Sequence, residues 1–188
     1  MRRDILEFAV LGVLADGPIH GYELRKQLTE MLGPFRSLSY GTLYPTLRRL
    51  LNRGAIEPVS LTPSEDARGM RSKRARIIYS LTPAGKEEFD EWANRPGPGS
   101  WDDVAFAAHM AFFSRTERRA RLRILHGRRT WLDEQLASLR ATLTDTRHTL
   151  DPYAQSMRSM NVESTEREMR WLDELIESEE AHTAKEEL

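Results

Sequence analysis

The sequence predicts a mainly α-helical protein, with a winged helix-turn-helix domain that carries a two-stranded β wing, followed by an α-helical dimerisation domain. Two observations predict this fold class. Three segments of helical periodicity precede two short segments in which apolar residues alternate, which is the winged-helix order of elements. Beyond the proline- and glycine-rich stretch at residues 95–100, helical periodicity continues to the end. We therefore expect a winged-helix domain at residues 1–95 and a helical domain at residues 100–188.

Four helices are expected in the first domain, at residues 5–14, 21–32, 39–53 and 83–94. The first is apolar on nearly all sides, which is typical of a helix at the centre of a small core. The third has a leucine stripe on one face, and Gly54 stops it. Pro45 fits if regular helix begins near Thr42, because proline is tolerated in the first turn. Thr82 and Pro83 predict the start of the fourth helix, as N-cap and first helical residue.

The predicted wing consists of two short strands, at residues 56–61 and 77–81, joined by a long polar loop. The loop, residues 62–76, carries five cations: Arg68, Arg71, Lys73, Arg74 and Arg76. The loop makes this part of the chain strongly basic.

Charge is distributed unevenly along a chain whose net charge is only −1. Residues 25–76 hold eleven Lys and Arg against four Asp and Glu, whereas residues 99–188 hold thirteen against seventeen. A basic segment joined to an acidic one indicates a nucleic-acid face on the first part and a protein–protein role for the second.

Several classes of function lack support in the sequence. There is no cysteine, which excludes disulfides, thiolate metal sites and cysteine nucleophiles. The histidines have no metal-ligand spacing, and no catalytic or phosphate-loop motif appears, so we expect neither a metal, nor a cofactor, nor an enzyme. The apolar N-terminal run contains Glu7 and lacks a cleavage site, and no stretch could span a bilayer, so a cytoplasmic protein is expected.

The third helix and the basic wing together favour binding to double-stranded DNA. A leucine-striped helix with a polar back is usually a surface helix, and a basic loop alone is weak support. The helix and the basic loop follow each other within one small domain, however. This order is typical of a helix that enters the major groove of DNA beside a wing that contacts the DNA backbone. The alternative is a winged helix that contacts a protein of the transcription machinery instead of DNA.

The second domain contains an apolar seam with alternating three- and four-residue spacing. Its members are Leu122, Leu125, Leu132, Leu136, Leu139 and Leu143. Such a seam must be buried against another helix, either in the same chain or in a second copy.

Three runs carry a more specific signal: residues 17–24 (GPIHGYEL), 41–50 (GTLYPTLRRL) and 79–86 (YSLTPAGK). They resemble the PadR family of transcriptional regulators, and residues 106–113 and 171–175 resemble the helical C-terminal domain of its longer subfamily. The resemblance implies a homodimer that represses transcription from an inverted-repeat operator until an effector relieves repression. The wing loop is longer than is usual in the family, and Ile78 stands where the family often has an aromatic residue.

The resemblance, together with the polar back of the third helix and the basic loop of the wing, gives a set of predicted DNA-contacting residues. The third helix supplies Ser39, Tyr40, Thr42, Tyr44, Arg48 and Arg49. The second helix supplies Tyr22 and Lys26 for phosphates, and the wing supplies Arg71, Lys73 and Arg74.

The resemblance implies a small aromatic effector, because related regulators bind planar aromatic molecules, and a set of large side chains after the linker is a candidate for its site. Its members are Trp101, Phe106, His109, Phe112 and Trp131. They could line an apolar cavity near the dimer interface, or they could simply be core residues.

Overall fold

The computed structural model describes residues 3–32, 40–59, 77–145 and 151–181. The chain divides into two compact units, one formed by Met1–Arg95 with Asp103–Thr116, the other by Pro96–Asp102 with Glu117–Leu188. Each unit is described by itself. No helix among the described residues is long and apolar enough to cross a membrane.

The first unit is a winged helix. Its elements are α1 (Arg3–Leu14), β1 (Ile19–His20), α2 (Gly21–Leu32), α3 (Tyr40–Asn52), β2 (Ile56–Val59), β3 (Ile78–Leu81), α4 (Pro83–Asn94), α5 (Asp103–Met110) and a 3-10 turn at Phe113–Arg115. The strands form an antiparallel sheet in the order β1-β3-β2, with Ile19 opposite Tyr79 and Ile56 opposite Leu81. The fold class is therefore confirmed, with a third strand that the sequence did not predict, because two residues are too few to show alternation.

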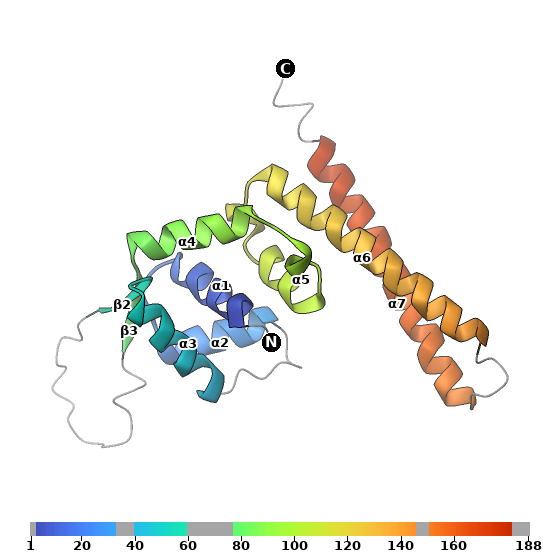
Figure 1. Cartoon of the computed structure of the whole chain (residues 1–188), viewed down its shortest axis with the longest axis horizontal. Helices are drawn as coiled ribbons and strands as arrows, with labels where there is room; N and C mark the ends of the chain where they lie inside the picture. The colour runs from blue at the N-terminus through green and yellow to red at the C-terminus, as the bar shows by residue number, and fades with distance from the viewer. Residues whose placement is uncertain (1–2, 33–39, 60–76, 146–150, 182–188) are drawn as a thin grey trace. The chain divides into compact units, whose positions relative to one another are not determined.

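Helix α1 lies at the centre of this unit and contacts α2, α3, α4 and α5 (Figure 1). Its residues Leu6, Val10 and Leu11 are at most 1% exposed, as the all-round apolar pattern predicted. Burial on several sides explains why the helix needs no polar face.

The bounds of α2 and α4 agree with the sequence prediction. Thr82 caps α4, and its Oγ1 accepts a hydrogen bond of 3.1 Å from the backbone N–H of Gly85. Helix α3, however, begins at Tyr40, so the expectation that regular helix starts near Thr42 was wrong. Pro45 consequently lies in the second turn, where it has no N–H to offer to the carbonyl of Gly41.

Helix α5 belongs to the first unit, although the sequence placed residues 100–188 together in the second domain. The physical reason is an aromatic cluster formed by Phe8, Phe89, His109 and Phe112. The Phe8 ring lies 5.3 Å from Phe89 and 4.7 Å from His109, measured between centroids. The Phe112 ring meets both phenylalanines edge-on and occupies the space beside Gly12, where a Cβ would lie 2.3 Å from it.

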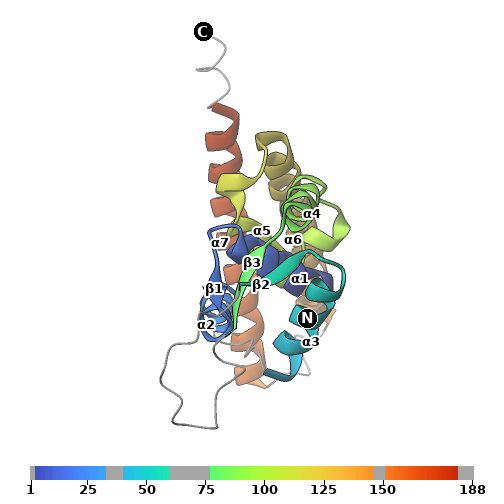
Figure 2. The ribbon, with the colours of Figure 1, turned by 90° about the vertical axis from the view of Figure 1, so that its left-hand side faces the viewer.

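The second unit consists of a 3-10 turn at Pro98–Ser100 and two long helices, α6 (Arg118–Asp145) and α7 (Pro152–Ala181). Ion pairs Arg121–Glu179 at 2.8 Å and Arg140–Glu166 at 2.6 Å show that α7 runs antiparallel to α6 (Figures 1 and 2).

The seam of α6 is largely covered by α7 of the same chain. Leu125, Leu132 and Leu136 are at most 4% exposed, and Leu172 and Ile176 of α7 are at most 8% exposed. Leu122 and Leu139 are half-buried, and the side chain of Leu143 lies outside the described residues. The sequence left open whether the seam packs on a helix of the same chain or on a second copy. In the structure, a helix of the same chain covers these buried leucines.

Candidate nucleic-acid interface

Helix α3 turns one face into the core and the other to solvent. Leu43, Leu47 and Leu50 are at most 1% exposed and fix the helix against the rest of the unit. Thr42 and Arg48 are exposed on the outer face. The helix therefore presents a hydroxyl and a guanidinium on a rigid support, which suits phosphates and base edges.

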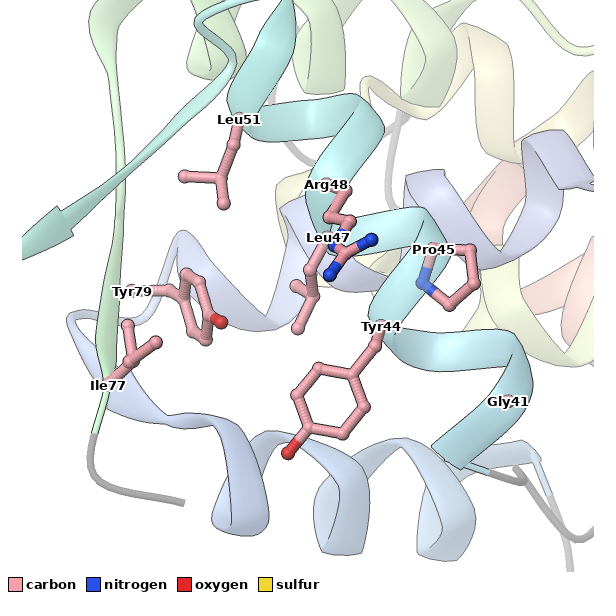
Figure 3. A pocket seen from close by; sticks show the side chains of 8 residues that line it. All are labelled: Gly41, Tyr44, Pro45, Leu47, Arg48, Leu51, Ile77 and Tyr79. Carbon is pink, nitrogen blue, oxygen red and sulfur yellow. The ribbon is translucent and has the colours of Figure 1, made fainter. Parts of the chain in front are cut away.

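A cavity of about 640 Å³ lies between α3 and strand β3 (Figure 3). It is lined by Gly41, Tyr44, Pro45, Leu47, Arg48, Leu51, Ile77 and Tyr79. Tyr44 and Arg48 project from α3, whereas Tyr79 comes from β3. Burial, and then the nearby Tyr44, raise the pKa of Tyr79 above its ordinary value, so its phenol stays protonated at neutral pH.

Arg49 points away from this cavity and into an ion-pair cluster. Its Nε donates to Oε1 of Glu7 at 2.7 Å, and a terminal nitrogen donates to Oγ1 of Thr46 at 3.0 Å. Arg53, one turn further on, donates to Oε2 of Glu7 at 2.6 Å and to Glu88 at 2.6 Å. A DNA contact by Arg49 remains a prediction, and the structure gives its guanidinium another partner.

The sequence analysis gave no role to Glu7, which the structure places at the centre of this cluster. Its side chain is only 7% exposed. Burial by itself raises the pKa of Glu7, but the hydrogen bonds and positive charges of Arg49 and Arg53 outweigh it and hold the pKa below the usual value. A signal existed, because a carboxylate inside an apolar helical run requires a cation, and Arg49 and Arg53 stand four residues apart on one helix.

Helix α2 carries the two residues predicted to hold phosphates. Tyr22 is 55% exposed, and Lys26, one turn later, is also exposed, with its Nζ 3.9 Å from Glu23. Both side chains are accessible from solvent, as a phosphate contact requires.

Several predicted contacts cannot be placed. Ser39, Arg71, Lys73 and Arg74 lie outside the described residues, and Tyr40 begins α3 with its side chain outside them. Their DNA contacts remain predictions.

The five predicted effector residues fall in different units. Phe106, His109 and Phe112 are at most 6% exposed in the first unit. Trp101 and Trp131 are half-buried in the second, where Arg128 lies 4.6 Å over the Trp131 ring and donates to the carbonyl of Trp101 at 2.7 Å. The effector cavity stays a prediction. Within the described ranges, no cluster of His, Asp and Glu could hold a metal ion.

Residues 10–91, from α1 through most of α4, match the Transcriptional regulator PadR-like family. This part of the chain is similar to the PadR-like family, and the match covers less than half of the 188 residues. The family is one of transcriptional regulators and not of enzymes.

One curated relative and two solved structures, all of PadR, are similar to this chain. The Negative transcriptional regulator PadR of Bacillus subtilis (strain 168) is 33% identical over 94 residues, which are 50% of this chain and 48% of that protein. The matched part thus spans about half the length of this relative. Crystal structures of B. subtilis PadR with operator DNA and with p-coumaric acid are both 21% identical, with TM-scores of 0.42 and 0.41, and cover 93% and 94% of this chain and 99% of theirs.

Proposed function

We propose that this PadR-like protein is a sequence-specific regulator, a repressor, that binds an inverted-repeat DNA operator as a homodimer in the cytoplasm. The observation that carries the proposal is the outer face of α3, where exposed Thr42 and Arg48 flank the half-buried Tyr44 on a helix anchored by buried leucines. The family of the domain and the negative regulator among its relatives support the same function.

In this proposal α3 enters the major groove, which is wide enough to admit one helix. Arg48 contacts a base edge or a phosphate, while Tyr22 and Lys26 of α2 hold the backbone on one side. Arg71, Lys73 and Arg74 of the wing are proposed to add phosphate contacts.

The proposal is tested by titrating the protein onto duplexes from its own promoter region and onto random duplexes. Binding is expected to prefer one promoter fragment, and the logarithm of its affinity should fall linearly with the logarithm of salt concentration. Absence of binding to every fragment at low salt, without effector, would overturn the proposed function. It would leave a protein-binding winged helix as the alternative.

In the same titration, Arg48→Ala should weaken operator binding by roughly 1–3 kcal/mol if the side chain reads a base. If it holds only a phosphate, affinity should fall about equally on operator and random DNA. Lys86→Ala is the matched control, since Lys86 is an exposed cation on α4. Equal affinities for wild type and Arg48→Ala on both duplexes would remove Arg48 from the interface.

The dimer is proposed on a face of α7 that points away from α6. Tyr153, Met157, Met160 and Trp171 are 88%, 59%, 53% and 42% exposed, and their spacing places them on one side of the helix. The residues that pack on α6, such as Leu172, lie roughly a quarter-turn or more around the axis, as 3.6 residues per turn requires. An apolar stripe that a partner helix leaves uncovered is typical of an interface between copies.

Light scattering at micromolar concentration should give a wild-type mass near twice 21.7 kDa. Met157→Asp would bring a charge into the interface and should shift the mass toward 21.7 kDa. Ser159→Asp is the control, because Ser159 is exposed on another side of α7. A wild-type monomer, or an undisturbed Met157→Asp dimer, would rule out this interface.

We further propose that the helical domain, residues 100–188, supports dimerisation and responds to a small aromatic effector that releases DNA. The residues predicted for this role are Trp101, Phe106, His109, Phe112 and Trp131.

A further inference from the structure

Glu7 joins three helices of the winged-helix unit through one buried carboxylate. One oxygen accepts a hydrogen bond from Arg49 of α3 at 2.7 Å, and the other accepts one at 2.6 Å from Arg53, the residue directly after α3. Arg53 also reaches Glu88 of α4 with a second nitrogen, at 2.6 Å. Two arginines and two glutamates thus form one cluster, whose formal charges cancel.

The cluster fixes the rotation of α3 about its own axis. Arg49 and Arg53 are four residues apart and therefore lie on the same side of the helix. Thr46 strengthens this side, because its Oγ1 accepts from Arg49 and donates to the carbonyl of Thr42 at 3.0 Å. Arg48 precedes Arg49 by one residue, so it points about 100° away from the side that Glu7 holds.

The cluster also determines which cations on or directly after α3 are available to bind DNA. Three arginines lie on or directly after this helix, but Arg49 and Arg53 are each bound to Glu7. Arg48 is exposed, and no described partner competes for it. If Arg49 bound a DNA phosphate instead, the buried carboxylate of Glu7 would lose one of its two cations, which is unfavourable for a buried charge.

We propose that Glu7 is a positioning residue that withholds Arg49 and Arg53 from DNA and leaves Arg48 as the cation that α3 presents. This inference rests on the proposed DNA-binding function. Keeping two cations out of the interface lowers affinity for DNA of any sequence, since phosphate contacts supply most non-specific binding. Operator and random DNA are affected about equally, so the cluster limits the overall electrostatic affinity of the unit and leaves sequence preference to other contacts.

Glu7→Gln tests the proposal, because glutamine has the same shape but no charge. The released arginines should make the salt dependence on random DNA steeper by about 1–2 units of slope, at roughly 0.9 per phosphate contacted. Affinity for random DNA should rise, and affinity for operator should rise by about the same factor, because added phosphate contacts act on every sequence. Glu87→Gln removes the same charge from an exposed position on α4 and should leave the slope at the wild-type value. A purely structural role would lower the unfolding temperature without changing the slope.

Arg49→Met provides a second test that leaves the Glu7–Arg53 pair in place. If Glu7 withholds Arg49, this variant keeps the wild-type slope, and in the background of Glu7→Gln it removes part of the added slope. Two results would overturn the inference even if the wild type binds its operator. One is a salt dependence of Glu7→Gln equal to that of the wild type. The other is a salt dependence of Arg49→Met that is weaker than the wild type's by about 1 unit of slope. Wild-type protein that binds no duplex would overturn the proposed function and this inference with it.

Discussion

Replacing Phe89 with alanine is expected to lower the free energy of unfolding of the winged-helix unit by about 3–5 kcal/mol, the usual cost of a buried Phe→Ala change. Phe89 is 1% exposed and lies between Phe8 and Phe112, with ring centroids 5.3 and 5.4 Å away. The cavity left by the ring would also loosen Phe112, which directly follows α5.

Urea denaturation followed by circular dichroism measures this loss. Tyr22→Ala is the control, because Tyr22 is an aromatic residue of the same unit that is 55% exposed, and its removal should change the free energy by less than about 0.5 kcal/mol. Similar values for the two variants would contradict the packing of Phe89 of α4 against Phe8 of α1 and against Phe112.

Lowering the pH from 7 to 4 is expected to cost the same unit about 3 kcal/mol through His109 alone, at 1.36 kcal/mol per pKa unit. Burial against Phe8 lowers the pKa of His109 to about 4, and its Nδ1 has no hydrogen-bond partner among the residues that the structure describes. The unfolded chain, where histidine has a pKa near 6.5, binds a proton between pH 6.5 and 4 while the folded chain does not. Acid therefore favours unfolding across this window, and the stability is fully present above it.

The measurement is the free energy of unfolding of wild type and His109→Phe from pH 7.5 down to 4. Phenylalanine fills the site without a titrating group, so the variant should lose much less stability over the range. Glu7 adds a loss of the same sign at lower pH, because its pKa lies below the ordinary glutamate value and its stabilisation disappears as the carboxylate becomes protonated. Parallel curves for the two proteins would show that His109 does not titrate in this window.

The helices and their local signals could be predicted from the sequence. The bounds of α2 and α4 and the Thr82 cap depend on interactions between residues a few positions apart. Such interactions can be predicted from the local amino-acid sequence. The outer face of α3 with Thr42 and Arg48 also followed, because helical periodicity places them away from the leucine stripe. The range predicted for α3, residues 39–53, lies within one residue of Tyr40–Asn52 at each end, but Pro45 lies in the second turn and not in the first.

The sequence by itself determined a winged helix of the PadR type, a basic α3 face and a long helical second part. Only the tertiary structure decided that α5 packs with the first unit, that α7 covers the leucine seam of α6, and that Arg49 is bound to Glu7. These outcomes join residues far apart in the chain, such as Glu7 and Arg49, which are 42 positions apart. Periodicity reports which face of a helix is apolar or charged, but the partner of that face is chosen by the packing of whole elements, which no local pattern records.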